Sequence, residues 1–225
     1  MNKKNKLIIK ELKGSLIASC QPIPKGPLDF SSFILASAKA SIIGGAKGLR
    51  IEGFKNLKVV KKYINLPVIG IKKRISKKYP VIITPLLSDV EKLSELGAEI
   101  IAFDSTLRDR PHSVGHLISK IHSCKKIAMA DCSTINDALN AIENGADILS
   151  TTLSGYVSSK SPPKNPDIKL LNQMIKKFKV PIIAEGRFNK PVFYKKAIKS
   201  GAHAVVVGSA LNRIELITKS FLDEV

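Results

Sequence analysis

The sequence repeats one short phrase, a Gly-Ala pair followed directly by a run of mostly apolar residues. The four copies begin at Gly45, Gly97, Gly145 and Gly201. In each copy a helical pattern ends at the glycine, a residue that readily takes the left-handed conformation found at helix C-termini. The apolar run that follows is typical of a buried strand in a parallel sheet. The spacing between copies leaves room for two strand–helix units from one copy to the next.

Other junctions use proline, since Pro67 and Pro181 each follow a helical pattern and open an apolar run. Helical patterns occur at residues 31–44, 55–64, 89–96, 113–123, 134–144, 167–178, 191–200 and 211–222. Strand patterns occur at 15–20, 48–52, 67–72, 81–84, 99–104, 126–131, 147–152, 181–185 and 203–207. No helix separates 67–72 from 81–84, so we interpret 81–84 as an extra piece that lines the mouth of the fold.

The remaining segments form eight strand–helix units and predict a (β/α)8 barrel. The chain has 225 residues, and barrels of this class run to about 250 residues with a practical minimum near 200. We therefore expect residues 1–225 to form a single barrel domain. A doubly wound open sheet is the alternative, but it would not need eight units.

The charge is strongly positive, with 37 Lys and Arg against 18 Asp and Glu, a formal net charge of +19. Such a balance raises the possibility of nucleic-acid binding. However, the basic residues are mostly Lys spread along the whole chain, and aromatic residues are only 5% with no Trp, so stacking platforms are scarce. A solvated Lys-rich surface, which would also attract an anionic small substrate, is the better interpretation.

Composition also bears on location. No apolar run approaches the roughly 18 residues that a membrane helix needs, so we expect no membrane span. The three cysteines, Cys20, Cys124 and Cys132, are odd in number and irregularly spaced, which favours a reducing compartment over a disulfide framework. Residues 17–20 look like a lipoprotein cleavage box, but Glu11 and Lys13 interrupt the apolar stretch before it. We expect a cytoplasmic protein.

Polar residues lie at the C-terminal ends of nearly all the predicted strands, where barrel enzymes carry their chemistry. In chain order they are Ser19-Cys20-Gln21, Arg50-Ile51-Glu52, Lys72-Lys73-Arg74, Asp104-Ser105-Thr106, Asp131-Cys132-Ser133, Thr151 to Tyr156, Glu185-Gly186-Arg187 and Gly208-Ser209. A single case is explained by an ordinary turn or helix N-cap. Eight in register indicate a functional mouth.

Two of these ends indicate a phosphate site. Gly186 follows the seventh barrel strand and Gly208-Ser209 follows the eighth, where backbone N–H groups can close on an anion and a short following helix adds its dipole. The pattern predicts a barrel of the phosphate-binding type with a phosphorylated substrate, which suits the positive charge.

The charged residues suggest an acid and a base on opposite sides of the ring. A lysine near other cations at a partly buried mouth can have its pKa lowered enough to act as a base, whereas Glu185 could have its pKa raised and hold a proton. Periodicity does not choose between Lys72 and Lys73, because adjacent strand residues point to opposite faces. Structural ion pairs at the rim remain the alternative. The four histidines are not at strand ends, so neither a metal site nor a histidine base is indicated.

Taken together, these segments resemble the N-acetylmannosamine-6-phosphate 2-epimerases of bacterial sialic acid breakdown. The matching segments, in order, are Ser19-Cys20-Gln21-Pro22, Arg50-Ile51-Glu52-Gly53, Ile69 to Arg74, Asp131-Cys132-Ser133-Thr134, Ser150 to Tyr156 and Ala184-Glu185-Gly186-Arg187. The resemblance runs from about Gly14 to Phe221. Two departures are Thr84-Pro85, where relatives often have a small residue, and Lys72, where they usually have an apolar one.

The resemblance implies inversion at C2 of an N-acetylhexosamine 6-phosphate without a cofactor or metal. Because the family lysine directly precedes the arginine, it selects Lys73 as the base, with Glu185 delivering a proton to the opposite face. Asp131 and Arg50 would hold the sugar and its developing charge. Substrate contacts would come from Gln21, Thr151, Thr152 and Tyr156, and phosphate contacts from Gly186, Arg187, Gly208, Ser209 and Arg213. The resemblance also makes a homodimer plausible.

Two rival functions remain. One is another sugar-phosphate enzyme on the same barrel, such as an aldolase that uses Lys73 as a Schiff-base amine. The other is a nucleic-acid-binding protein that exploits the positive charge, which predicts salt-dependent binding to unrelated oligonucleotides. The epimerase expectation includes no nucleic-acid partner and no membrane association.

Overall fold

Eight parallel strands close into a barrel in which each strand pairs with the next and β8 pairs with β1. The structure is a computed structural model that describes residues 1–157 and 162–223. The strands are β1 Ser15–Ser19, β2 Gly48–Glu52, β3 Val68–Ile71, β4 Ile100–Asp104, β5 Ile127–Asp131, β6 Ile148–Ser150, β7 Ile182–Ala184 and β8 Ala204–Val207. The predicted (β/α)8 barrel is confirmed, and the open-sheet alternative is wrong.

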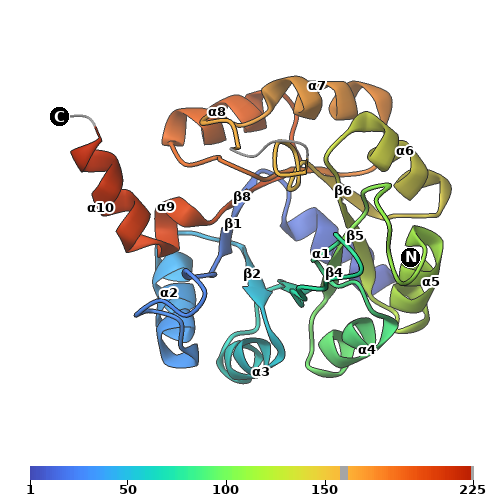
Figure 1. The fold of residues 1–225 in the computed structure, drawn as a ribbon, viewed down its shortest axis with the longest axis horizontal. Coiled ribbons are helices and arrows are strands. Elements are labelled where there is room, and N and C mark those ends of the chain that lie inside the picture. The colour runs from blue at the N-terminus through green and yellow to red at the C-terminus, as the bar shows by residue number, and fades with distance from the viewer. Residues whose placement is uncertain (158–161, 224–225) are drawn as a thin grey trace.

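Helices alternate with the strands and surround the barrel (Figure 1). They are α1 Lys3–Glu11, α2 Ser31–Ile43, α3 Phe54–Tyr63, α4 Leu87–Glu95, α5 Val114–Ser123, α6 Ile135–Glu143, α7 Ile168–Lys177, α8 Pro191–Lys199, α9 Ser209–Asn212 and α10 Ile214–Leu222. The four repeated glycines have φ values of 101°, 94°, 93° and 100°. Each therefore takes the left-handed conformation that the repeat predicted at the end of a helix.

The alternation of side chains along each strand decides what enters the barrel. Ile69 and Ile71 of β3, together with Ile127 and Met129 of β5, belong to the core cluster inside the barrel. Their neighbours in sequence instead pack against the surrounding helices, as Val68 and Ala128 do. Because the period is two, residues 50, 73, 131, 150, 152 and 185 continue the inward-facing rows at the C-terminal ends of their strands.

Helix α1 was not predicted. Most of its side chains are exposed, and only Asn5, Ile8 and Ile9 are buried. Ile8 and Ile9 of α1, followed by Leu12, nevertheless join the core cluster inside the barrel. Asn5 donates a side-chain hydrogen bond to the carbonyl of Lys125, two residues before β5 begins. Helix α1 therefore closes the end of the barrel opposite the predicted mouth.

Residues 81–84 make no barrel strand. Ile83 forms a single antiparallel bridge with Lys73, and the Thr84 N–H donates to the Lys72 carbonyl at 2.7 Å. Thr84 has a φ of 46°, and its buried hydroxyl donates to the Ala102 carbonyl at 2.7 Å. These bonds hold Thr84 in the left-handed conformation, so the segment lies across the end of β3 as the predicted extra piece.

The C-terminal helix differs from the prediction. The pattern at 211–222 predicted one helix as the outer partner of the eighth strand, but the helix divides at Arg213 into α9 and α10. Asn212 of α9 is buried and donates to the Ser19 carbonyl at 2.8 Å. Helix α10 buries none of its residues and extends away from the barrel (Figure 1). The break occurs because Arg213 leaves helical geometry, with φ −116° and ψ 78°.

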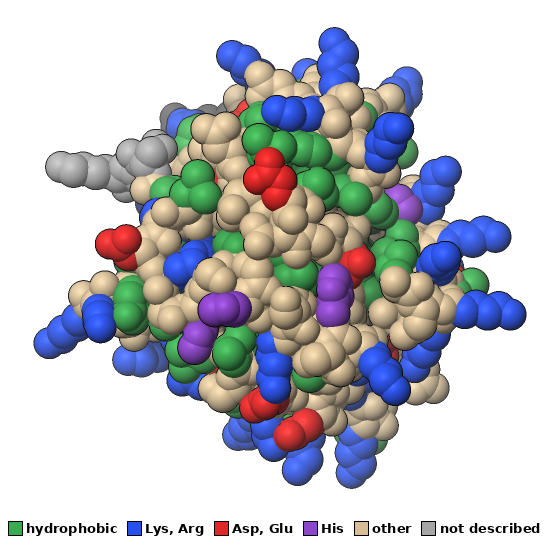
Figure 2. Space-filling view, turned by 90° about the vertical axis from the view of Figure 1, so that its right-hand side faces the viewer, with side chains coloured by type: hydrophobic (Ala, Val, Ile, Leu, Met, Phe, Trp, Pro, Cys, Tyr) green, Lys and Arg blue, Asp and Glu red, His purple; other side chains and the backbone are tan. Residues whose placement is uncertain are grey.

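Lysine and arginine side chains stand out around the edge of the face shown in Figure 2 and do not gather into one patch on it. This distribution agrees with a solvated basic surface on that face. None of the described helices is long and apolar enough to cross a membrane.

The glycine at the middle of β3 gives a test of the packing between strand and helix. A Cβ at Gly70 would lie 2.7 Å from the Ala98 Cβ and 3.3 Å from the Leu93 Cδ2. We expect Gly70→Ala to lower the free energy of unfolding by about 1–3 kcal/mol through overpacking. Urea unfolding at matched protein concentrations measures it.

The matched control is Gly44→Ala. Gly44 is exposed at the end of α2, and the nearest atom to its added Cβ is at 3.4 Å. Its effect should stay within about 0.5 kcal/mol. Equal stability of the two variants would contradict the packing described here.

Candidate active site

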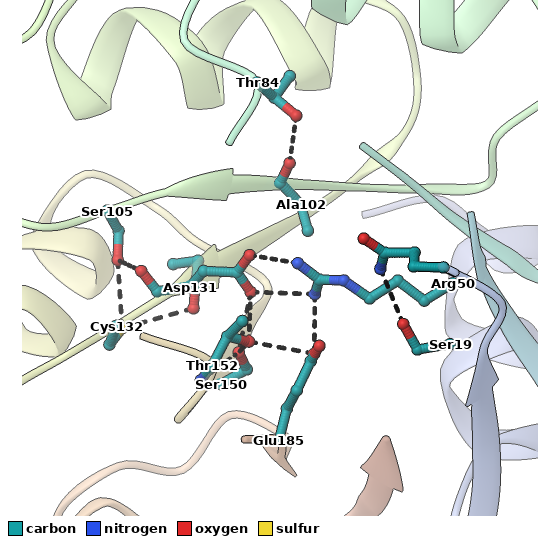
Figure 3. A network of polar contacts seen from close by, with 12 residues as sticks. Ser19, Arg50, Thr84, Ala102, Ser105, Asp131, Cys132, Ser150, Thr152 and Glu185 are labelled. Carbon is teal, nitrogen blue, oxygen red and sulfur yellow. Dashed lines mark hydrogen bonds and ion pairs between the residues drawn. The ribbon is translucent and has the colours of Figure 1, made fainter. Parts of the chain in front are cut away.

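One buried arginine joins three strands at the mouth of the barrel. Arg50 of β2 is 1% exposed; its Nη2 lies 2.6 Å from Asp131 Oδ2 and its Nη1 lies 2.8 Å from Glu185 Oε2 (Figure 3). Burial disfavours the charge of Arg50, but the two carboxylates outweigh it and raise the pKa of Arg50 above its ordinary value. Its Nε–H has no hydrogen-bond partner among the described residues. A ligand oxygen could accept that bond.

Two hydroxyl groups from the end of β6 support Asp131. The Ser150 and Thr152 hydroxyls lie 2.9 and 2.8 Å from Asp131 Oδ1. Thr152 Oγ1 also lies 3.1 Å from Glu185 Oε2, so it contacts both carboxylates that Arg50 joins (Figure 3). The sequence pointed to Thr152 but not to Ser150, which is the last inward-facing residue of β6.

Glu185 has a strongly perturbed carboxyl group. Burial raises the pKa of Glu185 to about 7, an effect that Arg50 opposes and Asp131 reinforces. Thr151 faces the outer side and fixes the Glu185 backbone: its hydroxyl donates to the Glu185 carbonyl at 2.8 Å and accepts from the Glu185 N–H at 3.1 Å. The carboxyl group can therefore be either protonated or ionised near neutral pH.

The structure separates the two candidate lysines. Lys72 Nζ lies 3.4 Å from Glu52 Oε1 and 5.6 Å from the centre of the Phe54 ring, beside the start of α3. Lys73 continues the inward row of β3 and makes no ion pair among the described residues. Burial lowers the pKa of Lys73, and the nearby charges of Arg50 and Arg213 lower it further.

Arg74, the residue after Lys73, holds the segment that follows β3 in place. The Arg74 guanidinium makes a bidentate contact with the buried Asp89 of α4, with Nε–Oδ2 at 2.8 Å and Nη2–Oδ1 at 2.7 Å. This contact fixes the backbone next to Lys73. Arg74 is therefore engaged outside the mouth.

The residues expected to bind phosphate follow the adjacent strands β7 and β8. Gly186 has a φ of 96°, and a Cβ there would lie 3.4 Å from the Thr152 carbonyl oxygen. Ser209 begins α9, where the first N–H groups have no partner inside the helix. Arg213 Nε donates to the Gln21 carbonyl at 3.3 Å. Gly208 packs against Ser19, its hypothetical Cβ meeting the Ser19 Cβ at 3.4 Å.

Three other candidate residues are engaged with the protein itself. Arg187 Nη1 donates to the Ser154 carbonyl at 2.6 Å and Nε to the Asn165 carbonyl at 2.8 Å. The guanidinium also lies 5.1 Å from the centre of the Tyr156 ring, which is half exposed. Gln21 donates from Nε2 to the Ser19 hydroxyl at 2.8 Å. Arg187 and Tyr156 thus hold the segment after β6, and the Gln21 side chain is anchored to β1.

The described residues contain neither a disulfide nor a cluster of possible metal ligands. Cys20, Cys124 and Cys132 are all free thiols. Burial raises the pKa of the Cys20 thiol to about 11, and it raises that of Cys132 as well. Within residues 1–157 and 162–223, no cluster of His, Cys, Asp and Glu has the arrangement of a metal site.

Comparison with known proteins places this geometry in a family. Residues 34–225 match the family model described as "Putative N-acetylmannosamine-6-phosphate epimerase". Curated relatives that carry the 2-epimerase name include one from Glaesserella parasuis, 44% identical over 96% of this chain and 92% of the relative. Another, from Klebsiella pneumoniae, is 47% identical over 91% of this chain and 86% of the relative.

A solved structure agrees. The N-acetylmannosamine-6-phosphate 2-epimerase from Clostridium perfringens superimposes with a TM-score of 0.94 at 38% identity, covering 97% of this chain and 96% of that one. The fold, the inward-facing charged residues and these matches together show that the chain belongs to the N-acetylmannosamine-6-phosphate epimerase family, a family of carbohydrate isomerases.

Proposed function

We propose that this protein interconverts N-acetylmannosamine 6-phosphate and N-acetylglucosamine 6-phosphate, in sialic acid breakdown, by removing and returning the proton at C2. The observation that carries the proposal is an acid and a base at one mouth with pKa values shifted toward each other. Burial lowers the pKa of Lys73 and raises that of Glu185 to about 7. Such paired shifts are typical of acid–base sites.

Lys73 serves as the base for one epimer. Lys73 follows β3 and Glu185 follows β7, four strands away around the eight-stranded ring, so a sugar held between them meets one group on each face. The neutral Lys73 amine takes the C2 proton, and the electron pair of the C–H bond moves into the adjacent C1 carbonyl. Glu185 then gives its proton to the opposite face of C2, and the carbonyl re-forms. The reverse reaction exchanges the two roles.

Arg50 stabilises the charge that develops during this step. The C2 proton is acidic only beside a carbonyl, so the sugar reacts in its open-chain form. The unpartnered Nε–H of Arg50 supports this role, because a buried N–H without a partner costs about 1–3 kcal/mol that a substrate oxygen could recover. Asp131 and Glu185 hold the guanidinium in place, as an electrostatic stabiliser requires. We propose that no cofactor takes part.

The phosphate site is proposed at the ends of β7 and β8. Gly186, Gly208 and Ser209 would offer backbone N–H groups, and Arg213 would add a charge. Arg187 would contribute through its backbone, since its guanidinium is engaged with Ser154 and Asn165. Gln21 and Tyr156 are proposed to contact the sugar. Thr151 would act on the substrate only through the Glu185 backbone that it holds.

A homodimer is proposed from the position of α10. A groove of about 990 Å³ runs beside α2 and Tyr194 of α8, lined by Leu16, Phe33, Ala36 and Ala40 among others. A helix that follows β8 normally packs in this position on a barrel. Helix α10 instead leaves it and exposes Leu216, Phe221 and Leu222. The α10 helix of a second copy fits the groove, because its exposed apolar side chains can cover the apolar lining that α10 of the same chain leaves uncovered.

The cytoplasmic location remains a proposal, supported by the three free cysteines.

The aldolase alternative is distinguished by borohydride trapping. A Schiff base on Lys73 would leave a stable mass increase after reduction in the presence of substrate, whereas the epimerase mechanism predicts none.

The catalytic residues are tested by single substitutions. Lys73→Ala and Glu185→Gln should each lower kcat for epimerisation by about 10²–10⁴-fold, the usual contribution of a positioned acid or base. Lys72→Ala is the matched control, because Lys72 faces Glu52 and Phe54 outside the ring, and it should keep most of the activity. A coupled assay for the glucosamine epimer gives the rates. Near-normal turnover by Lys73→Ala or Glu185→Gln would refute the assigned roles.

The pH profile is expected to be bell-shaped in both directions, because the active pair carries one proton in total. As pH rises through about 7, the doubly protonated pair loses a proton and activity increases. As pH passes the lowered pKa of Lys73, the last proton leaves and activity falls. In Glu185→Gln, the residual initial rate for the epimer that Lys73 deprotonates should rise only as Lys73 loses its proton, so the acid limb moves to the pKa of Lys73 and the alkaline limb disappears. An unchanged acid limb would assign it to another group.

The dimer is tested by size. Leu216→Asp places a charge on the apolar face of α10 and should convert a two-chain particle into a one-chain particle in sedimentation velocity. Val192→Asp, at an exposed position of α8 outside the groove lining, is the control and should stay dimeric. A one-chain mass for the unaltered protein would overturn the proposal.

A further inference from the structure

The two oxygens of the Glu185 carboxyl group have different surroundings. Oε2 lies 2.8 Å from Arg50 Nη1 and 3.1 Å from the Thr152 hydroxyl (Figure 3). Oε1 makes no hydrogen bond to any described residue. It is also not one of the buried atoms that lack a partner, which means that it is accessible to solvent. Oε1 is therefore the oxygen that remains open to the mouth of the barrel.

The Thr152 hydroxyl has one proton and three neighbouring acceptors, which are Asp131 Oδ1 at 2.8 Å, Glu185 Oε2 at 3.1 Å and the Ser150 hydroxyl. Of the two carboxylates, Glu185 needs this proton more, because Asp131 already has other donors. Asp131 receives two bonds from Arg50, at 2.6 Å on Oδ2 and 3.2 Å on Oδ1. It receives a third from the Ser150 hydroxyl at 2.9 Å. A hydroxyl has one proton to donate, and Glu185 Oε2 has only Arg50 besides Thr152.

We infer that Thr152 is a positioning residue that holds Glu185 Oε2, so that Oε1 faces C2 of the substrate and carries the transferred proton. This inference rests on the proposed role of Glu185 as the acid. It gives Thr152 a different task from the direct substrate contact that the family resemblance implies. With Arg50 and Thr152 both on Oε2, rotation of the carboxyl group about its last bond is blocked.

The arrangement works in both protonation states of Glu185. When Glu185 is protonated, Oε1 carries the proton and Oε2 accepts from Arg50 and Thr152 as a carbonyl oxygen. During transfer the Oε1–H bond breaks and the C2–H bond forms, while Thr152 keeps its own proton. In the ionised state Oε2 still accepts the same two bonds. The carboxyl group is thus in the same orientation when it acts as a base in the reverse direction.

Loss of the Thr152 hydroxyl should disturb this geometry without removing the charges around Glu185. Those charges come from Arg50 of β2, Asp131 of β5 and Lys73 after β3. Arg50 alone would then hold Oε2, and Oε1 could turn away from C2. Deprotonation by Lys73 would continue, but proton delivery to the other face would slow.

The test compares two reactions of each epimer in deuterium oxide. Exchange of the C2 proton for solvent deuterium reports deprotonation, and epimerisation reports delivery to the opposite face. In Thr152→Val, the ratio of exchange to epimerisation should rise about tenfold for the epimer that Lys73 deprotonates, as expected for one lost hydrogen bond to a charged group. Thr152→Ser retains the hydroxyl and should restore the ratio. Thr152→Ala gives the same readout as the valine variant without valine's methyl groups.

The outcomes separate the possible roles of Thr152. A fall in both rates with an unchanged ratio would show a structural role, and a raised KM with an unchanged ratio would show direct substrate contact; either result overturns the inference. Glu185→Gln is the reference and should raise the ratio at least as much. If Glu185→Gln leaves the ratio unchanged, Glu185 is not the acid, and the proposed function's mechanism fails together with the role of Thr152.

The pH profile gives an independent readout. The Thr152 hydroxyl stabilises the ionised form of Glu185 and lowers the pKa of that carboxyl group against the larger effect of burial. The acid limb of the profile should therefore move to higher pH in Thr152→Val and return in Thr152→Ser. A limb that does not move would contradict the contact between Thr152 and Glu185.

Discussion

The buried guanidinium of Arg50 organises the mouth of this barrel. It joins Asp131 and Glu185 from strands that are far apart in sequence, at 2.6 and 2.8 Å. Such an arrangement is stable only as a set, because removing one partner of a buried ion pair leaves an uncompensated charge and costs about 3–5 kcal/mol. The same charge balance sets the chemistry, since Arg50 limits how far burial raises the pKa of Glu185 and helps to lower that of Lys73.

Barrel closure is what brings these groups together. The inward-facing side chains are apolar along the strands, as Ile69 and Ile71 of β3 and Ile127 and Met129 of β5 are. They become polar at the C-terminal ends of the strands. Helix α1 closes the opposite end with Ile8 and Ile9. The charged groups therefore lie at the end of the barrel opposite α1, and their burial above the apolar rows is the largest cause of the opposite pKa shifts of the proposed acid and base.

The barrel and most of its mouth were predictable from sequence, because the Gly-Ala repeat marks helix–strand junctions and strand ends carry the polar residues. The choice between Lys72 and Lys73 was not. Both faces of a barrel strand are apolar, so the sequence alone does not show which row is inside. The different roles of Thr151 and Thr152 were not predictable from the sequence either, because it does not show which of the two adjacent hydroxyls faces the inside of the barrel. Nor does periodicity show whether α10 packs on its own barrel, since a helix has the same apolar face in either position.

The most direct test of the account is the reaction of the unaltered protein with N-acetylmannosamine 6-phosphate in deuterium oxide, followed at C2 by proton NMR. The account predicts conversion to the glucosamine epimer with deuterium entering C2, because the proton leaves to one group and returns from another that equilibrates with solvent. Conversion without any solvent deuterium at C2 would contradict this acid–base pair. If neither exchange nor conversion occurs, N-acetylmannosamine 6-phosphate is not the substrate.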